Sequence, residues 1–439
     1  MNVKKFFELA NEANVNESEV VIEKTKNLSI GVYQEQIENF TISTSFGIRA
    51  RGIYNGKMGF AESEKDDKTT PAYLVDEIKV GATVSESDEP AIIFKGSEKY
   101  KRRNLFNKDI INLSERTKID NLFLIERKLK AFDPRIVDVM VDYAEYTEDS
   151  KMHNSYGLKL SKKQSYYYYA AQIVVKEGEE TKTGFDVFLS DKVEEFDIDK
   201  FVEKVAQDGL NRLGGKPCKS GVYKTILNEK VTASLLRFYL INANAENVQK
   251  NSSLFIGKLN EQIASSKVTI LDAPLTKNVF YSYYDDEGVA KYNKPIIEKG
   301  VLKTYLYNLS TAAKDGVTST GNAVASNGKI SIAPSQVVLK PGRKTLEELM
   351  LDVKDGIYLT EVTGLHAGMN PTSGDFSLQA NGFIIKDGKI DSPLNLITVA
   401  GNLVDLFENV TSVGKDQELQ LSGYTTSPIV VKNLAISGE

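Results

Sequence analysis

The stretch from Tyr358 to Gly401 constrains the fold of this chain more than any other. Glycines are more closely spaced here than elsewhere in the sequence. Strand patterns lie at Tyr358–Val362, Phe376–Ile385 and Lys389–Ile397. The pair Asp387-Gly388 separates the last two patterns, and Asp-Gly between apolar runs is a strong hairpin signal. The sequence therefore predicts paired antiparallel strands here.

A glycine-rich loop connects the first two of these strand patterns. Between Gly364 and Gly374 the sequence reads GLHAGMNPTSG, which is too interrupted to predict a helix or a strand. The loop holds His366, one of two histidines in the chain. Loops held by a rigid sheet often carry binding sites. Two interpretations stay open: the loop binds a ligand, or its glycines only form turns.

The length of the chain predicts two domains, since 439 residues exceed one ordinary core. Helix and strand patterns alternate up to the polar stretch that begins at Lys216, which predicts an α+β domain over residues 1–215. Residues 216–439 combine an apolar helix, Lys230–Ala245, with many strands. We expect a β-rich barrel or sandwich around that buried helix, and an α+β fold class for the whole chain. The expected helices of the first domain are Lys4–Ala13, Pro71–Thr83, Ser114–Phe132 and Asp197–Leu213.

The charge balance argues against a nucleic-acid binder. The net charge is -5, whereas such proteins draw most of their affinity from a basic face. The tyrosine run Tyr166–Tyr169 could stack on bases. Neighbouring strand residues point to opposite faces, however. The run is more typical of a sheet with one packed face and one amphipathic face.

The sequence favours a cytoplasmic protein with no membrane partner. The N-terminus, MNVKKFFELANEAN, has no signal-peptide core, and no apolar run approaches the roughly 18 residues that span a bilayer. The single cysteine, Cys218, excludes an internal disulfide. Such cysteine usage fits a reducing compartment.

The residue types available for metal or nucleophile chemistry are few. His153, His366 and Cys218 are the only histidine and cysteine side chains, and a zinc site needs three or four grouped ligands. Nothing in their spacing suggests that they converge. HExxH, a GxSxG elbow and a GxGxxG after a strand are all absent from the sequence. The sequence predicts no cofactor.

A set of short segments in the second half nonetheless has a specific order and spacing. This set resembles the TldD/PmbA family, which is also called the modulator-of-DNA-gyrase family. The resemblance covers roughly residues 220–439 closely and the first half more loosely. The segments that carry it are Glu246–Lys250, Gly257–Leu259, Ile263–Ser265, Val268–Leu275, Ser373–Ser377, Gly382-Phe383, Asp387–Ile390, Pro393, Ile397–Leu403 and Val413–Asp416, with Gly47–Arg49, Asp133–Arg135 and Asn154–Gly157 in the first half.

The resemblance implies a choice between two branches. TldD-like chains resemble zinc metallopeptidases with HExxxH on the buried helix and a cysteine near the C-terminus. TldE-like chains lack these ligands and pair with a TldD-like chain. Here the positions of the motif hold Arg237, Phe238 and Asn242, and the tail Val413–Tyr424 has no cysteine. The chain is therefore similar to the TldE-like branch.

The chemistry of these three residues agrees with that assignment. A guanidinium has no lone pair for zinc and keeps its charge, and phenylalanine cannot act as a general base. We expect neither a zinc site nor catalysis by this chain alone. Arg237, on an apolar helix, should find a carboxylate or a backbone carbonyl, or else bind an acidic group such as a peptide C-terminus.

The resemblance thus implies a non-zinc subunit of a TldD–TldE-type peptidase. It would pair with a TldD-like chain and help to bind an extended or unfolded peptide by strand addition at the glycine loop and its flanking strands. Two alternatives stay open: a homodimeric peptide-binding or regulatory protein without a catalytic partner, and a chain that hydrolyses peptides by other residues. The candidate residues of a peptide cleft are Arg237, Asn242, His366, Asn370, Ser373, Gly374 and Asp375.

Overall fold

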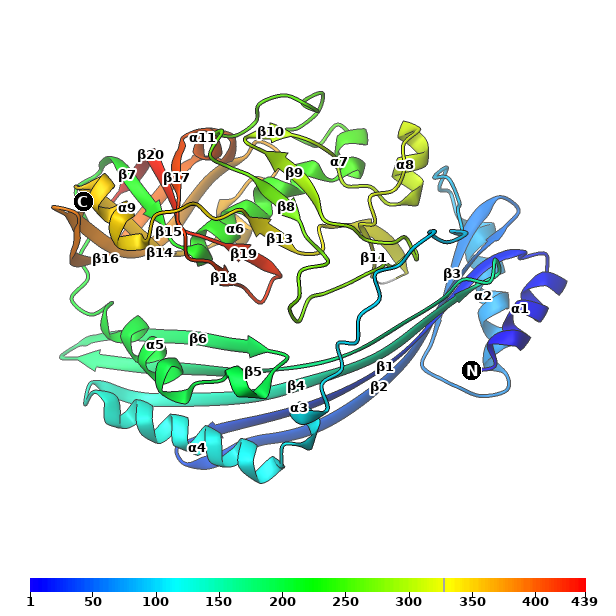
Figure 1. The fold of residues 1–439 in the computed structure, drawn as a ribbon, viewed down its shortest axis with the longest axis horizontal. Coiled ribbons are helices and arrows are strands. Elements are labelled where there is room, and N and C mark those ends of the chain that lie inside the picture. The colour runs from blue at the N-terminus through cyan, green and yellow to red at the C-terminus, as the bar shows by residue number, and fades with distance from the viewer. Residues whose placement is uncertain (327) are drawn as a thin grey trace. The chain divides into compact units, whose positions relative to one another are not determined.

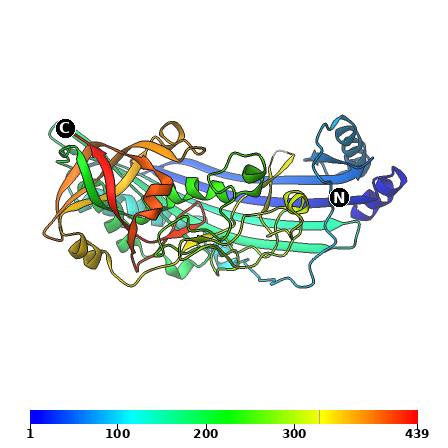
Figure 2. The same ribbon diagram turned by 90° about the horizontal axis from the view of Figure 1, so that it is seen from above.

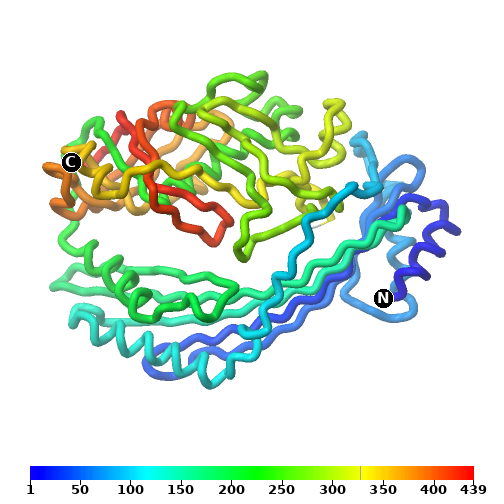
Figure 3. Tube along the Cα trace, viewed as in Figure 1, coloured from blue at the N-terminus to red at the C-terminus, as the bar shows by residue number. Residues whose placement is uncertain are grey.

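The protein folds into two compact units in a computed structural model that describes residues 1–326 and 328–439. Each unit is assembled from three segments of the chain, whose path can be followed in Figure 3. Two later segments of the chain return to the first unit, so the units are not continuous stretches of sequence. The domain boundary expected after residue 215 stays a prediction. Unit 1 comprises Met1–Leu210, Lys277–Lys291 and Tyr307–Ser331, and unit 2 comprises Asn211–Thr276, Tyr292–Leu306 and Ile332–Glu439.

Unit 1 is built on a six-stranded antiparallel sheet in the order β3-β2-β1-β4-β5-β6. Its long strands run side by side in Figure 2. The strands are β1 Glu17–Tyr33, β2 Gln36–Tyr54, β3 Lys57–Ser63, β4 Ile136–Asn154, β5 Lys159–Glu177 and β6 Glu180–Ser190.

The four helices expected in the first half are present as α1, α2, α4 and α5. The side chain of Ser114 caps α4 by accepting the Thr117 amide N–H at 3.0 Å, as its position before an amphipathic run predicts. Helix α5 ends at Leu210, before the predicted Leu213. The helices of this unit are α1 Val3–Glu12, α2 Thr70–Val84, α3 Lys108–Asn112, α4 Glu115–Phe132, α5 Ile198–Leu210 and α8 Leu309–Asp315.

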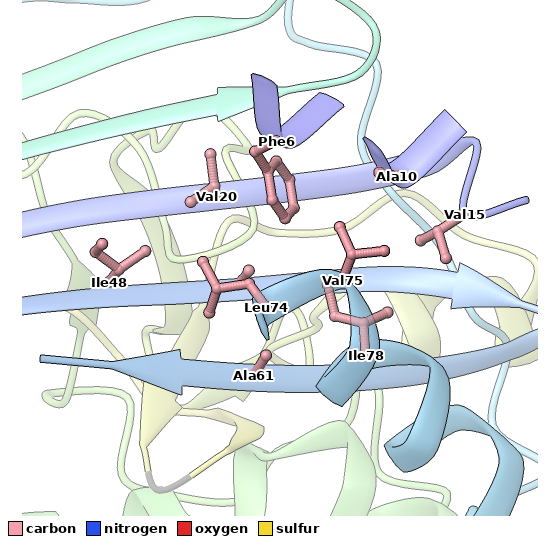
Figure 4. Close-up of a cluster of buried hydrophobic side chains, with 10 residues drawn as sticks. Phe6, Ala10, Val15, Val20, Ile48, Ala61, Leu74, Val75 and Ile78 are labelled. Atoms are coloured by element: carbon pink, nitrogen blue, oxygen red, sulfur yellow. The ribbon is translucent and has the colours of Figure 1, made fainter. Parts of the chain in front are cut away.

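One core of unit 1 lies where α1 and α2 pack on the sheet (Figure 4). Phe6 of α1 and Leu74 of α2 are fully buried against Val20 of β1. Helix α2 approaches β3 closely because Gly59 has no side chain: a Cβ there would overlap the carbonyl oxygen of Ile78. The helical and strand periodicities therefore meet at one apolar face.

The tyrosine run has the two-faced character that its strand position predicts. Tyr167 and Tyr169 are buried and their rings lie 5.9 Å apart, while Tyr166 and Tyr168 on the opposite face are half-buried. The ring of Tyr143, on the neighbouring strand β4, lies 5.0 Å from that of Tyr169. These rings pack against each other, so the run serves the core.

Unit 2 contains a closed five-stranded barrel in the order β7-β14-β15-β16-β20 (Figure 1). Pairing of Thr398–Ala400 in β16 with Ala435–Ser437 in β20 closes it, and β17 adds to β20 outside the ring. The β-rich barrel predicted for this half is confirmed. The strands are β7 Gly221–Leu227, β14 Gly356–Thr363, β15 Asp375–Lys386, β16 Lys389–Asn402, β17 Val410–Val413 and β20 Ile429–Ser437.

The predicted hairpin between β15 and β16 is also confirmed. Asp387 and Gly388 form its turn with φ of 50° and 75°, the backbone that a tight hairpin requires and that Asp-Gly accepts easily. This hairpin supplies two of the five barrel strands.

A second sheet and several short helices complete unit 2. The sheet has the order β10-β9-β8-β13-β19-β18. The long helix α6 ends at Leu240 and a 3₁₀ turn follows, so the predicted helix to Ala245 is too long. The remaining elements are β8 Ile270–Asp272, β9 Lys294–Glu298, β10 Val301–Leu302, β13 Val337–Leu339, β18 Glu418–Leu419, β19 Tyr424–Thr426, α6 Glu229–Leu240, α7 Ala245–Gln249, α9 Leu346–Val353, α10 Leu365–Gly368 and α11 Leu403–Glu408, while the hairpin strands β11 Ala323–Ser326 and β12 Lys329–Ile332 lie in unit 1 up to Ser331.

No helix within residues 1–326 and 328–439 is both long enough and apolar enough to cross a membrane.

Candidate functional site

Helix α6 carries two of the three positions at which the sequence raised a zinc question, Arg237 and Phe238, and the 3₁₀ turn after it carries the third, Asn242. Asn228 caps α6 by accepting the Val231 amide N–H at 2.8 Å. Its buried face centres on Tyr239, whose ring lies 4.4 Å from that of Phe407 and 5.0 Å from that of Phe255. Burial of this face holds the helix in unit 2. The buried residues are Val231, Thr232, Ala233, Leu235, Leu236, Tyr239 and Leu240.

Arg237 lies on the exposed side of α6. Within the described residues its guanidinium has no hydrogen bond or ion pair, so the structural partner expected for it is absent there. The physical reason is that water solvates a guanidinium on this open side. Its charge acts on Tyr424: burial raises the pKa of that phenol, and Arg237 opposes the rise. The Arg237 guanidinium is therefore available to bind an acidic group of another molecule.

Asn242 is 1% exposed and has a structural role. Its carboxamide oxygen accepts the Leu254 amide N–H at 2.7 Å, and its nitrogen donates to the Tyr239 carbonyl at 3.2 Å. The hydroxyl of Ser253 donates to the Asn242 backbone carbonyl at 2.6 Å. Asn242 therefore fixes the segment that follows α7.

Replacing Asn242 by alanine is expected to destabilise unit 2 by about 2 kcal/mol, because the half-buried amide N–H of Leu254 would lose its acceptor. Arg237→Ala is the matched control and should change the free energy of unfolding by less than about 0.5 kcal/mol. Hydrogen exchange of the Leu254 amide reports the effect locally. Equal losses in the two variants would contradict the structural role of Asn242.

The residues at the three positions do not fit a zinc ion. Arg237 is a cation, the half-buried Phe238 has no donor atom, and both side-chain polar atoms of Asn242 are engaged. Zinc takes imidazole, thiolate or carboxylate ligands. Across the part of the chain that the structure describes, no three His, Cys, Asp or Glu side chains gather as such a site requires.

Part of the glycine-rich loop forms a regular element that its sequence does not predict. Residues Leu365–Gly368 form one helical turn, α10. The prediction that this loop contains no helix is therefore wrong. Gly364 supplies the left-handed conformation at its start, with φ of 79°, which glycine adopts without strain. His366 lies exposed on this turn.

Four polar residues tie the end of the loop together. The side-chain oxygen of Asn370 accepts the amide N–H of Ser373 at 3.2 Å, and its backbone N–H donates to the Asp375 carbonyl at 2.8 Å. Asn402 donates to the Ser373 carbonyl and to the Asp375 carboxylate, both at 2.9 Å. The Asn402 bond is the main reason that the pKa of Asp375 is lowered. Most backbone groups here are already used inside the loop.

The loop and the end of α6 meet at Leu254. Its backbone N–H bonds to Asn242, and a Cβ on Gly374 would lie 3.0 Å from its Cδ1 atom. The structure thus brings Asn242 and Gly374 to the same place. No interaction recorded for the described residues joins Arg237 or His366 to this network.

The barrel changes how a peptide could bind. Strand addition needs a free edge, but β14, β15 and β16 each have a neighbour on both sides. Closure occupies only part of these edges, since β16 pairs with β20 at Thr398–Ala400 and β14 pairs with β7 at Ile357–Leu359. Strand addition at these strands stays a prediction. A peptide cleft that involves the candidate residues also stays a prediction.

Sequence reasoning missed a buried charge cluster in unit 1. Arg51 of β2 bonds to Glu19 of β1 at 3.0 Å and to Glu287 at 3.1 Å, with all three side chains at most 6% exposed. Nearby Asp285 accepts the amide N–H groups of Glu287 and Val289, and burial together with Glu287 raises its pKa to about 7. Arg51 and Glu287 are 236 residues apart, so no local pattern could have linked them.

A cavity of about 40 Å³ adjoins this cluster. Among the described residues, Oε2 of Glu19 and Nη2 of Arg51 have no hydrogen-bond partner. The volume has room for a few water molecules and is far below the roughly 300 Å³ of small-ligand pockets. We interpret the cluster as a structural ion-pair network rather than a small-ligand site.

Comparison with known proteins now decides the family. Three models of PmbA/TldA metallopeptidase domains match the chain: domain 1 at residues 18–79, the central domain at 108–213 and the C-terminal domain at 220–438. The chain belongs to the TldD/PmbA family. The resemblance inferred from the short segments is therefore confirmed.

Relatives in the TldD/PmbA family match along nearly the whole chain. A metalloprotease PmbA homologue of Buchnera aphidicola is 25% identical over 97% of this chain and 94% of its own length. The crystal structure of a proposed modulator of a DNA gyrase from Thermotoga maritima is 28% identical, with a TM-score of 0.91 and 99% of both chains covered. TldE from Thermococcus kodakarensis has the same fold, with 22% identity, a TM-score of 0.90, and 99% of this chain and 100% of that chain covered.

Proposed function

We propose that this chain is a TldE/PmbA-like, non-zinc subunit of a cytoplasmic metallopeptidase of the TldD–TldE type. Its partner would be a TldD-like chain that supplies the zinc and the catalytic residues. Its own contribution would be to complete the assembly and help to hold an extended or unfolded peptide.

One observation carries this proposal. Helix α6 and the 3₁₀ turn after it present Arg237, Phe238 and Asn242 where the peptidase branch would carry HExxxH. Asn242 is built into the fold and Arg237 faces outward. A chain of a metallopeptidase family whose motif positions hold a cation and a structural amide is suited to a supporting role. The exposed guanidinium suits an acidic group such as a peptide carboxylate.

Co-expression with a TldD-like chain from the same genome tests the proposal. We expect the two chains to co-purify and the pair to hydrolyse unfolded peptides faster than the TldD-like chain alone. Failure to co-purify, with no gain in activity, would sink the proposal. It would leave the alternative of a homodimeric peptide-binding or regulatory protein without a catalytic partner.

Two variants sharpen this test. Arg237→Glu reverses the exposed charge on α6 and should raise KM for peptides by about tenfold if the guanidinium holds a peptide carboxylate, which corresponds to about 1.4 kcal/mol. Arg116→Glu is the control, because the Arg116 side chain is 91% exposed on α4 of unit 1. An unchanged KM in Arg237→Glu would remove Arg237 from the proposed cleft.

A further inference from the structure

Another pocket of unit 1 lies between helix α1 and the turn that joins β4 to β5. Val3, Phe7 and Asn11 are spaced four residues apart and so share one face of α1. That face lines the pocket together with His153 and Lys159, at the ends of β4 and β5. Helix α1 lies at this end of the sheet in Figure 1. The pocket belongs to one compact unit of the chain.

The pocket continues the sheet face that α1 covers. Phe6 and Ala10 of α1 are buried with Val20 of β1, and α1 also packs on α2. On the neighbouring strand β4, His153 lies opposite Val20, and directly opposed residues share a face. The same face of the sheet therefore runs from the core under α1 into the pocket.

The pocket has the size and composition of a small-molecule site. Its volume is about 530 Å³, within the roughly 300–1,000 Å³ of such sites, unlike the cavity beside Arg51. Sites of this kind combine an apolar wall with a few polar groups. The apolar part of the wall consists of Val3, Phe7, Val15 and Leu158.

Every titratable side chain in the wall of this pocket is basic. Lys4, His153 and Lys159 line it, and within the described residues no carboxylate does. Lys4 lies 3.7 Å from Glu8, whereas Lys159 has no ion pair in the described part of the chain. The pKa of His153 is lowered, first by burial and then by the charges of Lys159 and Lys151. The pocket therefore favours a ligand with negative charge.

Ser18 of β1 adds a buried hydroxyl that has no partner. It is 0% exposed and lines the pocket. Its backbone N–H donates to Oγ of Ser155 at 3.1 Å, and its carbonyl accepts the Ser155 amide N–H at 2.8 Å. Its own Oγ has no hydrogen-bond partner among the described residues. Buried polar atoms are normally hydrogen-bonded, and the oxygen of a bound anion would accept this hydroxyl.

The first turn of α1 also favours an anion. Val3 and Lys4 of this turn line the pocket, and the turn contains no acidic residue. A helix N-terminus carries a partial positive charge of about +0.5. Its positive end therefore adds to the charges of the basic side chains.

We propose that this pocket binds a small organic anion, a phosphate ester or a carboxylate that carries one apolar group. The anionic group would lie among Lys159, His153 and Ser18. The apolar group would pack against Phe7 and Leu158. This site goes beyond the proposed function and does not depend on it.

NMR of the histidine side chains in the full-length chain tests the site, because the sequence has only two histidines. We expect phenyl phosphate to shift the imidazole signals of His153 with a Kd of about 1 mM, typical for a ligand of this size. The signals of His366, exposed on α10 of unit 2, should stay unchanged. A bound anion offsets the charges of Lys151 and Lys159, so the pKa of His153 should rise on binding.

Phenylacetate and benzyl alcohol define the ligand chemistry. Binding of phenyl phosphate but not phenylacetate would identify a phosphate site, and the reverse result a carboxylate site. Benzyl alcohol keeps the ring without the charge and should not shift the signals of His153. If neither anion shifts them, or if benzyl alcohol binds as well as the anions, the proposal is overturned.

Three variants connect the binding to this pocket. Lys159→Glu should weaken binding of the anion by about tenfold or more. Lys176→Glu is the matched control, because Lys176 is also exposed on β5 but does not line the pocket. Ser18→Ala removes a hydroxyl that makes no hydrogen bond, so it should weaken binding about threefold to tenfold and leave stability unchanged.

Equal affinities of the Lys159→Glu and Lys176→Glu proteins for the anion would also overturn the proposal, since the ligand would then bind elsewhere. Co-purification with a TldD-like chain requires no such ligand. The two proposals can therefore fail separately.

Discussion

Replacing Arg51 by methionine is expected to destabilise unit 1 by about 3–5 kcal/mol, the usual loss when one partner of a buried ion pair is removed. Glu19 and Glu287 would stay buried without their shared counter-charge, at 2% and 4% exposure. Asp285, whose pKa Glu287 already raises, adds to the repulsion. Methionine keeps most of the side-chain volume, so the loss reports charge rather than packing.

The measurement is urea unfolding combined with hydrogen exchange of amides in β1 and β2, since two units need not unfold as one transition. Arg116→Met is the control: its side chain is 91% exposed beside Asp120, and it should change stability by less than about 0.5 kcal/mol. Combining Arg51→Met with Glu19→Gln and Glu287→Gln should recover much of the loss. A loss below about 1 kcal/mol for Arg51→Met would contradict the geometry of the cluster.

Replacing Gly382 by alanine is expected to destabilise the barrel of unit 2 by about 3 kcal/mol, at the upper end of the range for overpacking. Gly382 lies in β15, beside a register shift between Ala380 and Gly382. A Cβ there would overlap the carbonyl oxygen of Tyr358 on β14. Backbone cannot rotate away as a side chain can, so the two strands would have to separate.

Gly47→Ala is the matched control, because a Cβ at Gly47 in β2 meets nothing within 4 Å and its φ is not positive. It should be neutral or stabilising by up to about 1 kcal/mol through the unfolded chain. Thermal unfolding with far-ultraviolet circular dichroism measures both variants. A Gly382→Ala protein as stable as the Gly47→Ala protein would show that β14 and β15 are not this close.

Local patterns predicted the elements of this fold well. The Asp387-Gly388 turn, the helix after Ser114 and the two-faced Tyr166–Tyr169 strand each depend on residues near in sequence, and each is present. The end of α6 was predicted too late, since apolar residues continue past Leu240 into a 3₁₀ turn. Periodicity cannot distinguish these two geometries over so few residues.

The candidate site was harder to predict for a physical reason. Sequence placed Arg237 and Asn242 on one apolar helix, but their exposure depends on which face meets the rest of unit 2. Arg237 turns outward, while Asn242 holds Leu254. The Arg51 cluster and the closure of the barrel depend on contacts between distant segments. No spacing rule reports such contacts.

The closed barrel has a consequence for synthesis on the ribosome. Strand β20 pairs with β7 through Ile429 and Leu227, so β7 must wait about 200 residues of elongation, roughly 10–40 s, for this neighbour. Unit 1 likewise waits for its last segment, Tyr307–Ser331. During that interval the nascent strands expose the edges that closure later hides, and a chaperone that shields strand edges should raise the yield of folded chain.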